Sequence, residues 1–206
     1  ISSLTNIKEK VSLKKLLQAI DDKNVFNGKI KFVDHHESHI TSSLAFSEFD
    51  ESVNVSLDGF GDFSSCAWGV YTNGKSTISE RIYFPHSLGI FYQAITQFLG
   101  FKNYGDEYKV MGLSSYGEEK FKDEISKLVF STNKGYELNL KYFTHHKKNI
   151  IKKNNNGQIE YENLYSNKLM EILGKERKKN DPITDIHKDI AKSAQVVLSL
   201  IHISEP

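Results

Sequence analysis

Three neighbouring segments near the middle of the chain are predicted to be β-strands. In the first, apolar and polar residues alternate with a period of two, and the second is rich in small and aromatic residues. The segments cover residues 52–57, 65–71 and 76–84. Asn73-Gly74, between the last two, is a strong hairpin signal. The run Asp58-Gly59-Phe60-Gly61-Asp62 is expected to turn the chain between the first two. The sequence therefore predicts an antiparallel meander of three strands.

Apolar residues at helical spacing predict helices on both sides of this meander. The expected helices cover residues 12–20, 35–46, 90–99, 118–129, 162–173 and 184–197. Two further strands are expected at 29–33 and 135–143. Residues 104–113 mix charges, aromatic rings and glycine without a clear period, which is typical of a loop that lines a site. The whole pattern predicts an α/β fold.

Two histidines open the second predicted helix at a spacing that suits a metal ion. His35 and His39 are four residues apart, so they share one helix face with Cβ atoms about 5–6 Å apart. Two imidazoles at that separation are able to bind one ion. Asp58, at the end of the next predicted strand, would supply a third ligand. Spacing alone is explained equally well by two polar residues that face solvent.

Gly59 and Gly61 follow Asp58 closely. Glycine lets the backbone turn tightly and bring N–H groups up to an anion. An ordinary turn is the commoner explanation of such a run. Before any family is considered, the residues therefore indicate a metal site, with phosphate binding as an additional hypothesis.

Composition and charge narrow the function classes. The chain has 206 residues, of which 38% are hydrophobic, and its net charge of +1 gives no electrostatic reason to expect nucleic acid or a membrane surface as partner. No apolar run approaches the ~18–20 residues of a membrane span. The single cysteine, Cys66, excludes an internal disulfide, so a reduced, cytoplasmic setting is expected. Cys66 is interpreted as a buried hydrophobe rather than a nucleophile.

Two segments are expected to lie outside the main fold. Residues 133–161 are interpreted as an insertion, with an exposed, basic, Asn-rich part at 145–157. Its His145 and His146 are expected to be solvated rather than a metal pair, because neighbours on a strand face opposite sides. Residues 198–206 resemble the translated read-through of a sequencing adapter, with a proline-closed helix end as the alternative. We expect residues 1–197 to be a domain fragment truncated at both ends.

Four segments, in order along the chain, carry a resemblance to a known family. They are H-H-E-S-H (35–39), L-D-G-F-G-D (57–62), F-P-H-S-L-G-I-F-Y (84–92) and L-G-F-K-N-Y-G-D-E-Y-K-V-M-G-L (99–113). The chain resembles the amino-terminal domain of carbamoyltransferases of the nodulation and antibiotic-tailoring type. The resemblance implies an actin/Hsp70/sugar-kinase-like (RNase H-like) fold, similar to the tRNA threonylcarbamoyl-transfer protein. It also implies a YrdC-like domain beyond the end of this chain.

The resemblance implies a chemistry as well. Members of the family use ATP and carbamoyl phosphate to form carbamoyl-adenylate in the YrdC-like domain, and pass the carbamoyl group to a hydroxyl of a small-molecule acceptor. For this chain the acceptor is expected to be a glycoside or secondary metabolite. The transfer site holds a divalent metal, expected to be Fe(II), whose ligands correspond to His35, His39 and Asp58. Two histidines and one carboxylate also suit zinc or manganese.

The remaining site residues implied by the resemblance fall into two groups. His36, His86 and Lys109 are expected to act in catalysis. Substrate or nucleotide binding is expected of Gly59, Gly61, Asp62, Ser87, Glu107 and Tyr108. Three alternatives stay open: packing for His36, helix capping for Ser87 and plain solvent exposure for Lys109.

Two other functions compete with carbamoyl transfer. One is a nucleotide-binding module without transferase activity, which would lack the adenylate-forming domain. The other is a metal-dependent hydrolase, which would need neither ATP nor carbamoyl phosphate.

Overall fold

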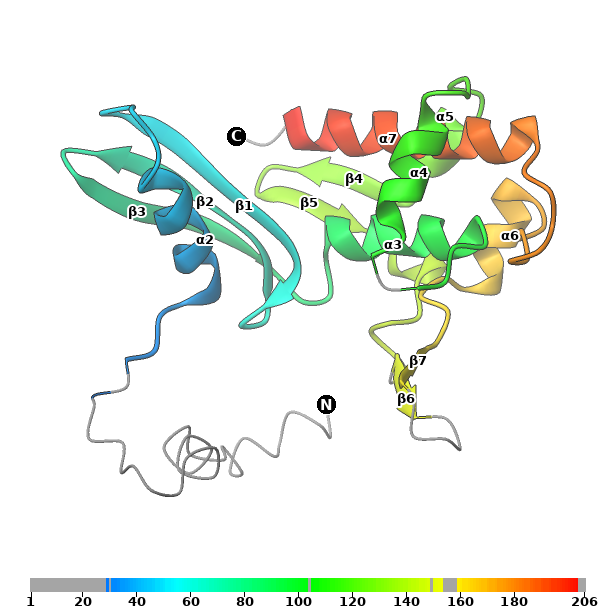
Figure 1. Ribbon diagram of the computed structural model, residues 1–206, viewed down its shortest axis with the longest axis horizontal. Helices are drawn as coiled ribbons and strands as arrows, with labels where there is room; N and C mark the ends of the chain where they lie inside the picture. The colour runs from blue at the N-terminus through cyan, green and yellow to red at the C-terminus, as the bar shows by residue number, and fades with distance from the viewer. Residues whose placement is uncertain (1–28, 30, 104, 149, 154–158, 204–206) are drawn as a thin grey trace. The chain divides into compact units, whose positions relative to one another are not determined.

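The computed structural model in Figure 1 describes residues 29, 31–103, 105–148, 150–153 and 159–203. Contacts within the chain divide it into two units, residues 1–33 and 34–206. All the helices and strands described below belong to the second unit. The helix predicted at 12–20 lies outside the described residues.

The strand predicted at 29–33 is wrong for the residues of that segment that the structure describes. Residues 29 and 31–33 have no regular secondary structure. The prediction rested on the alternation of Ile30 and Phe32, but a strand also needs a hydrogen-bonded neighbour. Among the described strands, none pairs with this segment.

The predicted meander is confirmed. Its strands are antiparallel in the order β1-β2-β3, as Figure 1 shows, with bounds β1 Ser52–Gly61, β2 Ser64–Thr72 and β3 Lys75–Tyr83. Asn73 and Gly74 both have positive φ, 52° and 73°, as a two-residue hairpin turn of type I′ requires. The sequence therefore gave the correct order and orientation of these strands.

The first turn of the meander lies further along the chain than predicted. β1 runs through Asp58 and Gly59 to Gly61, which pairs with Ser64. The two turn residues are Asp62 and Phe63, with φ of 50° and 70°. An irregularity in register between Leu57 and Gly61 accommodates the glycines within the strand. The glycines mark a bulged strand rather than a turn.

Helix α2, His35–Leu44, packs against β1 and β2. Asp34 caps its amino end, because the Asp34 side chain accepts a hydrogen bond from the Glu37 N–H at 2.9 Å. The helix ends two residues before the predicted end. The hydroxyls of Ser42 and Ser43 bond to carbonyls of their own helix, which weakens serine as a helix former near that end.

Helix α3, Leu88–Phe98, and helix α7, Asp185–Ile203, agree with the prediction within a few residues, except that α7 continues to Ile203.

The loop prediction for 104–113 is wrong, since helix α4 covers Glu107–Ser114 and packs on α7. Val110 is fully buried there. A single buried hydrophobe in a short helix leaves no readable period in the sequence, which explains the error.

The helix predicted at 118–129 is much shorter in the structure. Helix α5 covers Lys122–Ser126, and β4, Val129–Thr132, then pairs with β5, Gly135–Leu138. Val129 continued the apolar spacing of the helix, but its branched Cβ also suits a strand. The strand predicted at 135–143 likewise stops early, and the short 3-10 helix η2, Leu140–Tyr142, follows it. Helix α6, Asn167–Leu173, begins five residues later than predicted.

The expectation of a solvated His145 is wrong. The region predicted as an insertion does contain a hairpin, β6 Ile151–Lys153 with β7 Ile159–Tyr161. His145, however, is buried beside the rings of Phe60, Phe84 and Phe143. Its Nε2 lies 2.7 Å from the Pro85 carbonyl and therefore donates to it. Phe60 and Phe84 are distant from His145 in sequence, so local composition gave no sign of them.

The main core joins α3 to α4, α5, α6 and α7, and to strands β2, β3, β4 and β5. Its fully or nearly fully buried members include Phe91, Ile95, Phe98, Tyr136, Leu169 and Ala194. Cys66 and Trp68 of β2 belong to the same cluster, so the prediction that Cys66 is a buried hydrophobe is confirmed. Ile201 in the last turn of α7 is buried too. Among the described helices, none is long and apolar enough to cross a membrane.

Stability is expected to fall on acidification because of His145. Burial lowers the pKa of His145, the neighbouring His146 and His86 lower it further, and the bond to Pro85 opposes them. A histidine whose folded pKa lies below the unfolded value of about 6.5 stabilises the fold above that pH, and this contribution is lost as the pH falls further. Urea unfolding between pH 7.5 and 5 should therefore show a decreasing free energy of unfolding.

The matched variants are His145→Phe, which removes the titrating group, and Lys147→Gln, an exposed neighbour. We expect a smaller decrease with pH for His145→Phe and the wild-type decrease for Lys147→Gln. An unchanged pH dependence in His145→Phe would contradict the assignment.

Candidate functional site

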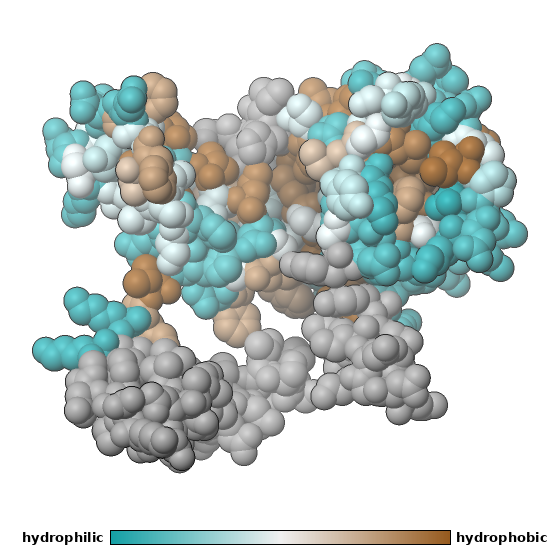
Figure 2. All heavy atoms as spheres, viewed as in Figure 1, coloured by the Kyte–Doolittle hydropathy of each residue, from teal (hydrophilic) through white to brown (hydrophobic). Residues whose placement is uncertain are grey.

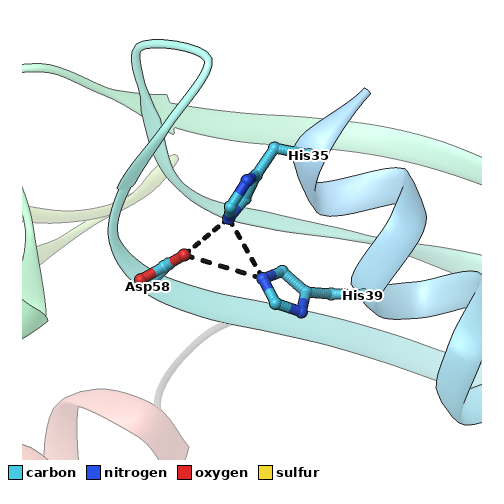
Figure 3. A group of neighbouring side chains, drawn as sticks. All are labelled: His35, His39 and Asp58. Atoms are coloured by element: carbon cyan, nitrogen blue, oxygen red, sulfur yellow. Dashed lines mark hydrogen bonds and ion pairs between the residues drawn. The ribbon is translucent and has the colours of Figure 1, made fainter. Parts of the chain in front are cut away.

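Three side chains predicted as metal ligands lie together where α2 crosses β1, as Figure 3 shows. The His35 Nε2 lies 2.6 Å from the Asp58 Oδ2 and 3.0 Å from the His39 Nε2. The third side of the triangle, from the His39 Nε2 to the Asp58 Oδ2, is 3.6 Å. His35 and Asp58 are partly buried and His39 is exposed, so the group lies at the surface.

The geometry of this triangle fits one metal ion. Ligand atoms about 2.0–2.2 Å from an ion, at angles of about 90–110°, lie about 3–3.5 Å apart. Of the three observed separations, 3.0 Å lies in that range, 3.6 Å is slightly longer, and 2.6 Å, a hydrogen-bond distance, is shorter. Their chemistry also fits, because imidazole nitrogen and carboxylate oxygen are ligands of iron, zinc and manganese. The role of these residues as ligands stays a prediction.

The Asp58 carboxylate is held in its ionised form by its neighbours. Partial burial raises its pKa, but hydrogen bonds from His35 and from the Gly59 N–H, with the charges of the histidines, outweigh burial and hold the pKa below its ordinary value. The Ser87 hydroxyl donates to the Asp58 carbonyl at 3.2 Å. Both the side chain and the backbone of Asp58 are therefore fixed.

The hairpin turn between β1 and β2 contacts the amino end of α2. The Asp62 Oδ2 accepts a hydrogen bond from the His35 N–H at 2.9 Å. Gly61 lies against the His35 ring, since a Cβ on Gly61 would be 2.0 Å from the His35 Cδ2. In this structure Asp62 and Gly61 therefore position the helix, although both were expected to bind substrate.

His36 differs from its two histidine neighbours because it is completely buried. Its Nδ1 lies 2.8 Å from the Ser56 hydroxyl and its Nε2 lies 3.1 Å from the Ser64 carbonyl. The packing alternative thus describes the observed position of His36.

A cavity of about 490 Å³ opens beside Asp58. Its walls are Leu57, Asp58, Gly59, Leu88, Gly89, Tyr92, Gln93, Gly105, Glu107, Met111, Gln195 and Leu198. They come from β1, α3, α4 and α7, and Figure 2 shows hydrophobic side chains gathered near the β1 edge of the sheet and beside α7. The cavity is large enough for a small ring molecule, with polar groups at a few points of an apolar wall.

Tyr92 and Glu107 supply two of these polar groups. The Tyr92 hydroxyl donates to the Gln195 Oε1 at 2.8 Å. Burial and the nearby Glu107 carboxylate raise the pKa of Tyr92, so its hydroxyl stays protonated. Among the described residues that line the cavity, Glu107 and Asp58 are the two that carry a carboxylate.

Four other predicted site residues do not line the cavity. Ser87 is buried and caps α3, accepting from the Ile90 N–H at 3.2 Å. The His86 Nδ1 accepts from the Leu138 N–H at 3.0 Å, and burial lowers its pKa. The Lys109 ammonium donates to the Asp106 carboxylate at 2.6 Å, and this hydrogen bond raises the pKa of Lys109. Tyr108 is exposed. The structure therefore unites Asp58, Gly59 and Glu107 in the cavity, but not Lys109 or Tyr108.

Sequence reasoning missed the contributions of Tyr92, Met111 and Gln195 to this wall. Tyr92 and Met111 belong to two of the four segments that carry the family resemblance, so membership of those segments was a usable signal. Gln195 lies on α7 and had none.

Comparison with known proteins decides the family. Residues 4–205 match the family described as Carbamoyltransferase N-terminus. The chain belongs to this family. The match confirms the resemblance inferred from the four segments.

Relatives in other organisms agree with this assignment. The chain is 33% identical over 192 residues to an uncharacterised protein of Synechocystis, covering 91% of this chain and 29% of that protein. It is 31% identical over 195 residues to the nodulation protein NolNO of Sinorhizobium fredii, covering 93% and 25%. It is 30% identical over 174 residues to the nodulation protein NolO of Bradyrhizobium diazoefficiens, covering 82% and 27%. The chain thus spans less than a third of the length of these relatives.

The contact between Gly61 and His35 leads to a stability prediction. Gly61→Ala should destabilise the protein by about 1–3 kcal/mol, because the new methyl group would displace the His35 ring. Thermal or urea unfolding measures the effect.

Gly59→Ala is the matched control, because a Cβ at that position of the same strand has nothing within 4 Å. It should change stability by no more than about 0.5 kcal/mol. Equal losses in the two variants would show that the Gly61 contact has no special importance.

Proposed function

We propose that the protein containing this segment is an O-carbamoyltransferase that uses carbamoyl-adenylate, made from ATP and carbamoyl phosphate. Membership of the carbamoyltransferase family supports this proposal. The observation that carries it within the chain is the cluster of His35, His39 and Asp58, of which Asp58 also lines the cavity. The proposed acceptor is a small molecule with a hydroxyl group, such as a glycoside or a secondary metabolite.

At the carbamoyl carbon, the proposed reaction forms one bond and breaks one. The acceptor hydroxyl oxygen attacks the carbonyl carbon of the carbamoyl group. The bond from that carbon to the phosphate oxygen of the adenylate breaks, and AMP leaves with the bonding electron pair. The hydroxyl proton passes to a base in the site.

His35, His39 and Asp58 are the residues that would hold the metal, proposed as Fe(II). A divalent metal bound there would supply Lewis-acid polarisation of a carbonyl or phosphate oxygen. The cavity beside Asp58 would place the acceptor next to these residues. Within it, Glu107 is the proposed group that orients the acceptor hydroxyl and takes its proton.

The proposal extends to the fold and to the rest of the protein. A three-stranded antiparallel meander followed by a helix is compatible with an actin/Hsp70/sugar-kinase-like domain. A YrdC-like domain elsewhere in the polypeptide would form the carbamoyl-adenylate.

The first test removes the proposed metal ligands from the complete protein. His35→Ala/His39→Ala and Asp58→Asn should lose bound metal and lower kcat/KM for carbamoyl transfer at least about 100-fold, since a Lewis acid contributes several kcal/mol to a transition state. Elemental analysis and a coupled assay for AMP release measure the two effects.

Glu37→Gln is the control. Glu37 lies on the same helix, its side chain is exposed, and its described hydrogen bond goes to Asp34 and to none of the three proposed ligands. It should keep both metal and activity. Absence of metal from the wild-type protein would reject the centre, and ester hydrolysis without ATP would favour a hydrolase instead.

The second test concerns the acceptor. Glu107→Gln should lower kcat for carbamoyl transfer by about 100-fold or more, because an amide cannot take the hydroxyl proton, and should leave the metal content unchanged. Glu119→Gln, an exposed glutamate outside the cavity, should have wild-type kinetics. A wild-type kcat in Glu107→Gln would exclude Glu107 as the base.

A further inference from the structure

His36 is a fully buried polar side chain between the two histidines of the candidate centre. Each of its ring nitrogens has a partner in the hairpin beneath α2. The Nδ1 lies 2.8 Å from the Ser56 hydroxyl in β1, and the Nε2 lies 3.1 Å from the Ser64 carbonyl at the start of β2. His36 therefore connects one helix to two strands.

These partners fix the tautomer of the ring. A carbonyl oxygen only accepts, so the Nε2 of His36 must carry the hydrogen and donate to Ser64. In the neutral ring the Nδ1 then accepts from the Ser56 hydroxyl. A neutral imidazole satisfies both bonds, which leaves no buried polar atom of the ring without a partner.

This arrangement excludes His36 from proton transfer with a substrate. The side chain has no exposed surface, and both nitrogens are engaged inside the protein. A general base has to come within hydrogen-bond reach of the proton it removes. The expectation that His36 is catalytic therefore conflicts with its position in the structure.

The bond from His36 to Ser56 joins the same two elements, α2 and β1, that carry the candidate ligands. Ser56 lies two residues before Asp58, so both side chains lie on the same face of β1. His36 directly follows His35 and precedes His39 by three residues. The ring centroids of His35 and His36 are 5.4 Å apart, and those of His36 and His39 are 6.3 Å apart.

We propose that His36 is a positioning residue that sets the distance between the histidines of α2 and the carboxylate of β1. The inference rests on the proposed metal centre. Residues that bind one metal ion together must keep their positions to within a few tenths of an ångström. Groups that orient such ligands typically contribute 10- to 100-fold to metal affinity. The bonds of His36 to both strands prevent α2 from sliding along or rotating over the hairpin.

Ile40 provides a matched comparison for simple packing. It is one turn further along α2, almost completely buried, and apolar. Shortening Ile40 weakens the packing of the helix, but leaves both bonds of His36 in place. Variants at the two positions therefore separate positioning from packing.

The experiment compares His36→Leu, His36→Gln and Ile40→Ala with the wild type, all in the complete protein. Titration with Fe(II), Zn(II) or Mn(II) gives metal affinity, and thermal unfolding of the metal-free protein gives stability. We expect His36→Leu to weaken metal binding about 10- to 100-fold. His36→Gln retains a donor for the Ser64 carbonyl and should recover part of the affinity, whereas Ile40→Ala should lower the unfolding temperature and change the affinity less than about threefold.

Two results would overturn the inference. One is a metal affinity in His36→Leu equal to that of the wild type. The other is a loss of affinity in His36→Leu and Ile40→Ala that simply follows their losses of stability. If His36→Leu does not fold, Ser56→Ala replaces it, since this change removes one partner of His36 and keeps the imidazole.

A measurement without metal distinguishes this inference from the proposed function. Nitrogen-15 NMR of the histidine side chains in the metal-free protein should show His36 as a neutral Nε2–H tautomer. The His35 and His39 signals should shift in His36→Leu and stay in place in Ile40→Ala. Failure of the wild type to bind metal would reject the proposed centre, while another tautomer at His36, or unmoved His35 and His39 signals in His36→Leu, would reject the positioning role.

Discussion

The close approach of α2 to the β1–β2 hairpin is the constraint on which the candidate site depends. Gly61 has no side chain, and the His35 ring occupies the space that a Cβ would need. The turn that follows, Asp62-Phe63, has both residues in the left-handed region and directs the Asp62 carboxylate to the His35 N–H. Non-glycine residues in that region have a conformational cost, which the surrounding hydrogen bonds offset. The first turn of α2 is thereby docked on the hairpin.

The same docking explains why α2 carries a polar residue, His36, on its buried side. A helix that packs on a sheet usually does so through an apolar stripe. In α2 only His36 and Ile40 are buried, and one of them is polar. Asp34 adds an ion pair to Arg81 of β3 at 2.9 Å. Directional bonds therefore hold this helix in one register, where apolar contacts alone would allow it to slide.

Elements whose signals lie within a short stretch of sequence were predicted correctly. Features that depend on contacts between distant residues were not. The alternation in the first meander strand and the Asn73-Gly74 turn signal are local, and both predicted elements that the structure contains. Helix α4 was missed because Val110 is its one strongly buried hydrophobe. The turn was misplaced because Gly59 and Gly61 allow a bulge as readily as a reversal, and only pairing with β2 distinguishes the two. Burial of His145 depends on Phe60 and Phe84, far away in the chain.

The hydroxyl of Ser87 has a consequence for how the cavity responds to its contents. That one oxygen caps α3 and also donates to the Asp58 carbonyl, so the first turn of the helix and the strand move as one piece. Leu88 and Gly89, the next residues of α3, are cavity wall. A molecule too large for the cavity would push on that wall and strain the Asp58 backbone. The cavity wall and the Asp58 backbone are thus mechanically coupled, through a bond of 3.2 Å.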